Sequence, residues 1–356
     1  MKKINNFQSA AALALSATFI FALHSKVAAN DEPLPEDFYE GRTLTVFIAS
    51  NPGGGTDTTA RIVANNWHRT IPGEPNIRIR NRPVNVIQGN YMQRQVNPDG
   101  MTVGVFAGGG SLGPVARNDP AAQYDPRTWG MVGMVERGPT VLIIREEALE
   151  RLTDPDAEPV VIGSVSTDRP QDAMAVFGGE LLDWNVRFVL GYPSSSQMYL
   201  AYERGEIDMF GSGTANIIDR FTQDEGAVAL VAYQPRADLP DVPTFSELLG
   251  DAHPGSDSSM WRAYLNWTGP STLDKYFVVP PETPDNILQH LRTSFKALED
   301  DAQFQNQISA QLGGAAVVIS GEEAYEMLLG ALDVDPEVQG TVNRLREKYR
   351  LPLMQD

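Results

Sequence analysis

The sequence predicts an α/β protein built from two lobes, each with a mostly parallel sheet. Runs of β-branched and aromatic residues alternate with segments of helical character, which is the pattern of βαβ units with right-handed crossovers. These units fall into two separate sets, one within residues 30–140 and one within 141–250. The last third of the chain, 251–356, is mainly helical and is expected to return to the first lobe.

The first set of units begins with a buried strand. Residues 44–49 are rich in β-branched and aromatic side chains, which favour a strand inside a sheet. A glycine turn at 51–57 ends this strand, and residues 58–68 have helical character. The same reasoning predicts, in order, a strand at 77–80, a helix at 91–96, a core strand at 101–106 and a strand at 140–144.

The second set repeats the alternation. A strand at 160–165 is followed by a polar turn and a helix at 171–182, and a strand at 186–190 is followed by a helix that ends near residue 204. Two further strands are expected at 207–210 and 227–232. Helices then dominate, and they are predicted at 284–297, 302–312, 321–332 and 336–349.

The first 29 residues predict a cleavable secretory signal peptide. A pair of lysines precedes an apolar run from residue 10 to residue 23, and Val27 and Ala29 occupy the small-residue positions before a cut after Ala29. The apolar run is shorter than the roughly 20 residues that span a bilayer. An uncleaved anchor is the alternative, but the mature chain is expected in the periplasm.

Composition narrows the range of partners. The net charge is −18, and loss of the three lysines in the signal peptide makes it more negative, which argues against nucleic acid and anionic membranes. An anionic ligand is still compatible with this net charge, because salt screens the electrostatic effect of charges that lie more than about 10 Å away. The chain has no cysteine, so disulfides and a cysteine-linked lipid are excluded.

The strongest local signal is the loop with Gly53, Gly54, Gly55, Thr56 and Asp57. Glycines allow a sharp turn with exposed N–H groups, and the positive end of the following helix favours an anion there. The loop lacks the endings of phosphate-binding and dinucleotide-binding motifs, so a carboxylate fits better than a nucleotide. A plain tight turn is the alternative for the glycines, and an N-cap is the alternative for the aspartate.

Three other loops are candidate parts of the same site, because ligands in α/β sheets bind at the carboxyl ends of strands. An arginine there could clamp a carboxylate, and hydroxyls could either contact a ligand or cap a helix. A flexible connector, a surface arginine and simple capping are the alternatives. The candidate residues are Gly109, Gly110 and Ser111 in the first loop, Thr167 and Arg169 in the second, and Ser194, Ser195 and Ser196 in the third.

No catalytic motif is found. The chain has no Gly-x-Ser-x-Gly elbow, no His-Glu-x-x-His sequence and no cluster of metal ligands, and none of its four histidines falls in a motif. We therefore expect no catalytic residues, no metal and no cofactor, and we expect a monomer.

Residues 40–335 resemble the extracytoplasmic receptors of tripartite tricarboxylate transporters. Each matching segment is weak alone, but their order and spacing are specific. The segments are 38–46 (FYEGRTLTV), 52–61 (PGGGTDTTAR), 81–83 (NRP), 97–104 (NPDGMTVG), 124–126 (YDP), 191–192 (GY), 203–208 (ERGEID), 239–245 (LPDVPTF) and 280–284 (PPETP).

The resemblance implies a type II Venus-flytrap fold, with two crossovers between the lobes and a cleft that holds an organic acid for a membrane permease. It implies a di-, tricarboxylate or aromatic acid held on the glycine and serine loops named above. A periplasmic ligand sensor and an enzyme on the same scaffold are the alternatives. The chain departs from the family at 84–89, 167–169 and 260–275, which leaves the identity of the acid open.

Overall fold

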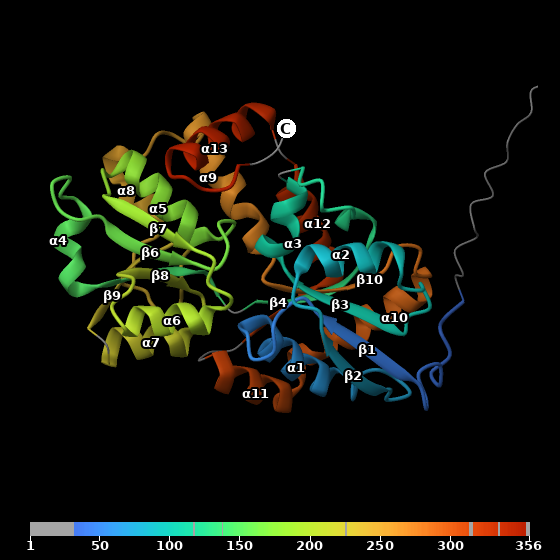
Figure 1. Ribbon diagram of the computed structural model, residues 1–356. Coiled ribbons are helices and arrows are strands. Elements are labelled where there is room, and N and C mark those ends of the chain that lie inside the picture. Colours follow the sequence, from blue (N-terminus) through green and yellow to red (C-terminus); the bar gives the residue numbers. More distant parts are fainter. Residues whose placement is uncertain are drawn as a thin grey trace, which may run out of the picture.

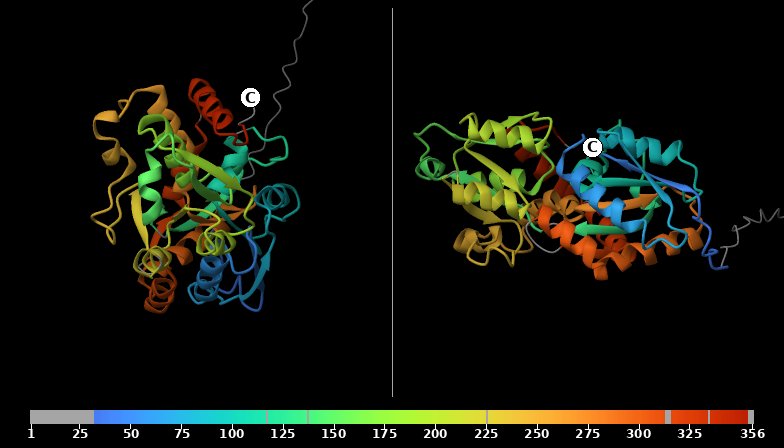
Figure 2. Two further views of the ribbon diagram at one scale, coloured as in Figure 1. Left: turned by 60° about the vertical axis from the view of Figure 1, so that its left-hand side comes forward. Right: turned by 90° about the horizontal axis from the view of Figure 1, so that it is seen from below.

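Two mixed sheets with flanking helices form two lobes that lie side by side (Figures 1 and 2). The computed structural model describes residues 32–116, 118–136, 138–224, 226–312, 316–333 and 335–353. The predicted signal peptide, 1–29, lies outside the described residues. In the described part of the chain, no helix is long and apolar enough to cross a membrane.

The sheet of the first lobe has the strand order β11-β4-β10-β3-β1-β2. β1 is parallel to β2 and β3, whereas β10 runs antiparallel between β3 and β4, and β11 is antiparallel to β4. The strands are β1 (Thr43–Ile48), β2 (Asn76–Asn81), β3 (Thr102–Ala107), β4 (Gly130–Glu136), β10 (Lys275–Val279) and β11 (Val317–Ser320).

Helices cover both faces of this sheet because its central strands are apolar on both sides. In β10, Phe277 and Val279 point into one core, and Tyr276 and Val278 point into the other, as the two-residue period of a strand requires. Helices α1 (Gly55–Trp67), α10 (Asp285–Lys296) and α11 (Ala302–Leu312) pack on the first face, and α2 (Asn85–Arg94), α3 (Gly108–Ala116) and α12 (Gly321–Leu332) on the second.

The sheet of the second lobe has the order β7-β6-β8-β5-β9. β6 is parallel to β7 and β8, and β5 is antiparallel to β8 and β9. The strands are β5 (Val141–Arg145), β6 (Val160–Ser164), β7 (Val186–Leu190), β8 (Met209–Ser212) and β9 (Ala227–Ala232).

Helices also cover both faces of the second sheet. On one side, α6 (Ser195–Glu203) and α7 (Ala215–Asp224) enclose a core with Phe210 and Phe221. On the other, the core includes Phe177, Tyr264 and Leu345 from three different helices. The helices of that side are α5 (Pro170–Leu181), α8 (Phe245–Leu249), α9 (Ser259–Thr268) and α13 (Pro336–Lys348), and the short α4 (Leu149–Leu152) follows β5.

Among the described elements, the chain passes from one lobe to the other three times: between β4 and β5, through the crossing segment 268–275 between α9 and β10, and between α12 and α13. This differs from the expected two crossovers and from the expected assignment of 251–356 to the first lobe. α9 packs against α5, and α13 packs against α9, because their apolar faces, with Trp267 and Val342, complete the core of the second lobe (Figure 1). The sheets are also mixed rather than mostly parallel, because β10 and β11 run antiparallel to their neighbours in the first sheet and β5 does so in the second.

Trp67 provides a test of the first core. It is fully buried at the end of α1, donates from its indole N–H to Ser294 Oγ at 3.0 Å, and meets Phe277 and Phe295 edge-on. We expect Trp67→Ala to lower the free energy of unfolding by about 3–5 kcal/mol, because it leaves a large cavity. Urea unfolding followed by circular dichroism measures this loss.

Val317→Ala in β11 is the control, because Val317 is 55% exposed and its truncation should change stability by less than about 0.5 kcal/mol. Equal losses in the two variants would contradict this description of the core.

Candidate functional site

A cleft of about 430 Å³ lies between the two lobes, at the carboxyl ends of strands from both sheets. Its first wall comes from the loops after β1 and β3 and from the start of α2. Its second wall comes from the loops after β6, β7 and β8, and the crossing segment 271–275 closes one side. A groove of about 510 Å³ between residues 32–34 and α10 contains none of the predicted site residues.

The glycine loop after β1 contributes Gly54, Gly55 and Thr56 to the cleft. Gly54 is the N-cap of α1, so the first amides of a 13-residue helix open towards this wall. Gly53 does not line the cleft. It has φ +77°, a left-handed conformation that favours glycine, and it forms the turn that brings the next residues to the surface.

Asp57 is buried beneath this loop and does not reach the cleft. Its carboxylate accepts from the Gly53 amide at 2.8 Å, from Arg61 Nε at 2.9 Å and from Asn81 Nδ2 at 2.6 Å. Burial acts to raise the pKa of this carboxyl, but the bonds from Arg61, Asn81 and Gly53 outweigh it and hold the pKa below its ordinary value. Asp57 therefore stays ionised and fixes the shape of the loop.

The glycines after β3 form the first turn of α3, not a flexible connector. A Cβ on Gly108 would lie 1.9 Å from the Pro270 carbonyl oxygen, so only glycine allows the helix to approach the crossing segment this closely. Gly109 and Gly110 line the cleft. Ser111 lies behind them, fully buried, with its hydroxyl 2.8 Å from the Ala107 carbonyl oxygen and 2.7 Å from Tyr276 Oη.

Arg169 lines the second wall of the cleft as the N-cap of α5. Its Nη1 lies 3.4 Å from Ser195 Oγ, so two of the predicted loops meet here. Ser194 both lines the cleft and caps α6, because its side chain accepts from the Gln197 amide at 3.3 Å. Ser195 also lines the cleft, whereas Ser196 is exposed outside it.

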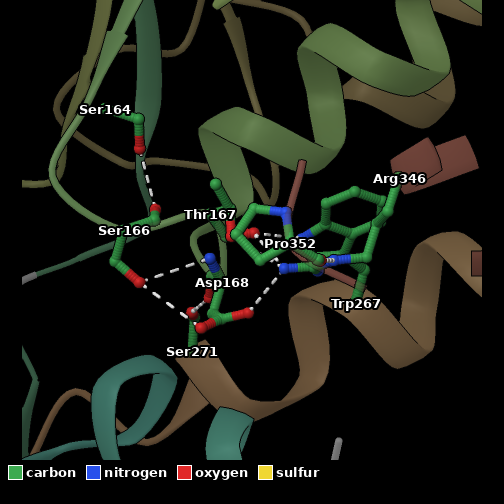
Figure 3. Close-up of polar contacts among 8 residues, drawn as sticks. All are labelled: Ser164, Ser166, Thr167, Asp168, Trp267, Ser271, Arg346 and Pro352. Atoms are coloured by element: carbon green, nitrogen blue, oxygen red, sulfur yellow. Dashed lines mark hydrogen bonds and ion pairs between the residues drawn. The ribbon is translucent and has the colours of Figure 1, made fainter. Parts of the chain in front are cut away.

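Thr167 points away from the cleft, towards the C-terminal helix (Figure 3). Its hydroxyl accepts from Arg346 Nη2 at 2.8 Å, and its carbonyl accepts from Trp267 Nε1 at 2.9 Å. The Arg346 guanidinium also bonds Asp168 Oδ1 at 2.9 Å. Thr167 therefore positions the loop, and we do not retain it as a ligand contact.

Four residues fix the loop after β6 on the side away from the cleft. We call them the Arg346 cluster, which consists of Arg346, Trp267, Thr167 and Asp168. The guanidinium is nearly completely buried and lies 4.4 Å from the Trp267 ring centroid, in cation–π geometry. Ser271, in the crossing segment, donates to the Asp168 carbonyl oxygen at 3.1 Å. The sequence offered no motif for this cluster, although Trp267 stood out as a departure from the family pattern.

The charged groups around the cleft give it an electrostatic potential that favours the binding of an anion. Two acids line it, but Asp168 is paired with Arg346 and Asp274 is paired with the buried Lys275. Arg169 and the N-termini of α1, α3, α5 and α6 add positive potential from both lobes. Asn85, the first residue of α2 and part of the segment where the sequence departs from the family, adds an amide to the first wall and was not predicted.

Nothing in the site has the composition of a metal centre. Within the described residues, no group of three or more histidine and acidic side chains could hold a metal ion. His68, His253 and His290 lie outside the cleft.

Asp172, at the start of α5, is an ionisable group buried beside the second wall. Burial raises its pKa to about 7, against the opposing effects of the nearby Ser164 hydroxyl and Arg169 guanidinium. Ser164 Oγ donates instead to the Ser166 carbonyl oxygen at 2.8 Å. Neither carboxyl oxygen of Asp172 has a hydrogen-bond partner among the described residues.

Arg346→Met tests the cluster. The substitution removes the guanidinium while it keeps most of the apolar volume, and it breaks the ion pair with the mostly buried Asp168 carboxylate. Breaking such a pair costs about 3–5 kcal/mol, so we expect a clear fall in the thermal midpoint. Arg344→Met, two residues earlier on α13 and exposed, should change stability little. Equal midpoints for the two variants would contradict the role of Arg346.

Asp172→Asn tests the raised pKa. The pKa of Asp172 in the folded protein lies above its unfolded value of about 4. Protonation of Asp172 therefore makes its full contribution to the free energy of unfolding below about pH 4. It is lost as the pH rises through about 7. The Asn variant lacks this titration, so its melting midpoint should rise relative to that of the wild type between pH 4 and pH 7. Exposed Asp219→Asn is the control, and a pH-independent difference for Asp172→Asn would disprove the shift.

Comparison with known proteins identifies the fold. No protein-family model matches the chain, and no curated protein matches it. The periplasmic binding protein BugD superposes with a TM-score of 0.59 at 19% identity, over 88% of this chain and 98% of BugD.

Two ligand-bound structures from Rhodopseudomonas palustris are also similar. MatC with bound malate has a TM-score of 0.56 at 20% identity over 86% of this chain and 98% of its own. A second protein, with adipate, has a TM-score of 0.59 at 16% identity over 88% and 99%. The chain therefore has the two-lobed α/β fold of periplasmic binding proteins, as its resemblance to the receptor family implied.

Proposed function

We propose that this protein is an extracytoplasmic receptor that captures a small organic carboxylate. One observation carries the proposal: helix N-termini from both lobes, together with Arg169, line a single cleft. Helix N-termini present unpaired amides and positive potential, and a guanidinium can bind a carboxylate through two parallel hydrogen bonds. The cleft volume of about 430 Å³ suits a small molecule.

In this proposal the first lobe holds the carboxylate, and the second lobe completes the site. The amides of Gly55 and Thr56 and of Gly109 and Gly110 donate hydrogen bonds to the anion, whereas the Gly54 amide is already donated to the Asn51 carbonyl oxygen. Arg169 approaches from the second lobe, with the hydroxyls of Ser194 and Ser195 beside it. Capture is reversible and involves no bond making or breaking, so the protein is a binding protein and not an enzyme.

Closure of the lobes around the acid would complete capture. Two hydrogen bonds already link the second lobe to the first lobe and to the crossing segment: Asn216 Nδ2 donates to the Gln311 carbonyl oxygen at 2.9 Å, and Ser271 donates to the Asp168 carbonyl oxygen. The crossing segments can act as hinges, since small backbone changes there move whole lobes. A closed cleft also removes water from the carboxylate, which strengthens its bonds to the amides.

The similar structures support a carboxylate as the ligand, because MatC holds malate and the second R. palustris protein holds adipate. A solute-binding protein of the TctC type from Polaromonas, 14% identical with a TM-score of 0.57, has the same fold. We therefore propose that the protein is exported to the periplasm after cleavage at Ala29 and delivers its acid to the membrane permease of a tripartite tricarboxylate-type transporter.

The proposal predicts stabilisation by carboxylates. A ligand that binds only the folded protein raises its free energy of unfolding, and therefore its melting temperature. The gain in free energy of unfolding is about 2.7 kcal/mol when the ligand concentration is a hundred times the dissociation constant. A thermal-shift screen should include mono-, di- and tricarboxylates, aromatic acids, amino acids and neutral amides. If no carboxylate raises the melting temperature, the proposed function is wrong.

Arg169→Gln should weaken the binding of any acid found in that screen about 10- to 100-fold, because a hydrogen bond to a charged group contributes about 1.5–3 kcal/mol. Isothermal titration calorimetry measures the change. Arg187→Gln is the matched control, since Arg187 is exposed on β7 and does not line the cleft. Unchanged affinity in Arg169→Gln would remove the arginine from the site.

A further inference from the structure

Gln171 is the most unusual polar residue of the cleft. It lies in the first turn of α5, only 2% exposed, and it lines the second wall. Its side-chain nitrogen, Nε2, has no hydrogen-bond partner among the residues that the structure describes. A buried donor without a partner costs about 1–3 kcal/mol, so native proteins seldom keep one without a use.

The backbone opposite Gln171 is shaped to admit its side chain. Gly211, in β8, also lines the cleft, and a Cβ on this residue would lie 2.5–2.8 Å from the Cβ, Cγ and Cδ atoms of Gln171. Any larger residue at 211 would displace the carboxamide. Close packing against this bare stretch of strand therefore fixes the stem of the glutamine, and no hydrogen bond of its Nε2 holds the carboxamide in one orientation.

Three uncharged polar side chains share this part of the wall, and the cation of the second wall, Arg169, binds the first carboxylate in the proposed function. Ser212, Tyr199 and Thr140 line the cleft with Gln171 and Gly211, and Tyr199 Oη lies 3.4 Å from Ser212 Oγ. The acid closest in sequence is Asp172, which is fully buried behind the wall. A second carboxylate of a ligand would lose its water here, beside neutral groups and a buried carboxyl, whereas a neutral acceptor would lose much less.

We infer that the Gln171 carboxamide is the specificity-determining donor of the second lobe, and that it selects acids whose far end carries an uncharged hydrogen-bond acceptor. The ligand class is then a monocarboxylic acid with a carbonyl, amide or hydroxyl group opposite the carboxylate. This inference rests on the proposed function, in which the carboxylate lies on the glycine loops of the first lobe. A site with a buried donor discriminates strongly against ligands that leave the donor unpaired.

A matched series of acids tests the inference. Butyrate, succinamate and succinate share one carboxylate and differ at the far end, which is a methyl, a carboxamide or a second carboxylate. The same end groups on five- and six-carbon chains allow for the length of the cleft. Calorimetry on the wild-type protein should give the tightest binding for a carboxamide acid, by about 3- to 10-fold over its methyl and dicarboxylate counterparts.

Gln171→Met keeps the volume of the side chain and removes the donor. We expect this variant to bind the methyl acid as the wild type does and to lose the preference for the carboxamide, so that the two affinities agree within about twofold. Gln197→Met is the control, because Gln197 is exposed on α6 outside the cleft and its replacement should leave every affinity unchanged. Circular dichroism and melting curves check that the variants are folded.

The outcomes separate this inference from the proposed function. A wild-type protein that binds the dicarboxylate best, or a Gln171→Met variant that keeps the preference for the carboxamide, would overturn the inference while carboxylate capture stands. An equal loss of affinity for all three end groups in Gln171→Met would also overturn it, because the residue would then act only through the shape of the wall. Failure of the wild type to bind any acid would overturn both.

Discussion

The buried guanidinium of Arg346 organises the part of the molecule where the two lobes meet. It lies in the core of the second lobe, yet its bonds go to Thr167 and Asp168, in the loop that forms the cleft wall. A buried cation is tolerated only when it is paired and hydrogen-bonded, and here the pairing partner, Asp168, itself lines the cleft. The C-terminal helix thus fixes the binding loop without touching the cleft.

This arrangement also sets the electrostatics of the site. Arg346 compensates the negative charge of the Asp168 carboxylate, which lines the cleft, and so reduces its repulsion of an acid. Lys275, which lines the cleft itself, pairs with Asp274 on the crossing segment. Because both acids are paired with cations, the helix N-termini and Arg169 dominate the potential in the cleft. A strongly acidic protein can in this way keep a local site for an anion, since distant charges are screened.

The parts of this structure that the sequence predicted are those encoded locally. The runs at 44–49 and 160–165 form β1 and β6, and the glycine loop after β1 opens a helix as expected. The turn at 108–110 was not recognised as helical, because glycine disfavours helices and only the close approach to Pro270 explains the α3 start. Strand β10 and the return of α13 to the second lobe depend on packing between distant segments, which local patterns do not encode.

The candidate site divides in the same way. Its glycines, Arg169 and the serines of α6 belong to loops that follow strands, and their positions followed from the rule that such loops share one edge of a sheet. Thr167 sits in such a loop but turns away from the cleft, because a residue 179 positions later binds its hydroxyl. Gln171 was missed because a glutamine inside a helix gives no local signal, and its burial comes only from the bare strand at Gly211.

The two lobes approach each other closely beside the cleft, and this approach explains why the wall requires both a glycine and a fixed loop. A Cβ on Gly109, in the first lobe, would lie 2.7 Å from the Asp168 carbonyl oxygen and 2.9 Å from Ser271 Oγ. First lobe, second lobe and crossing segment therefore meet at one point. Since Arg346 determines the position of Asp168, the C-terminal helix also determines how closely the walls approach each other. In the proposed receptor, the shape of the second wall thus depends on a helix that does not line the cleft.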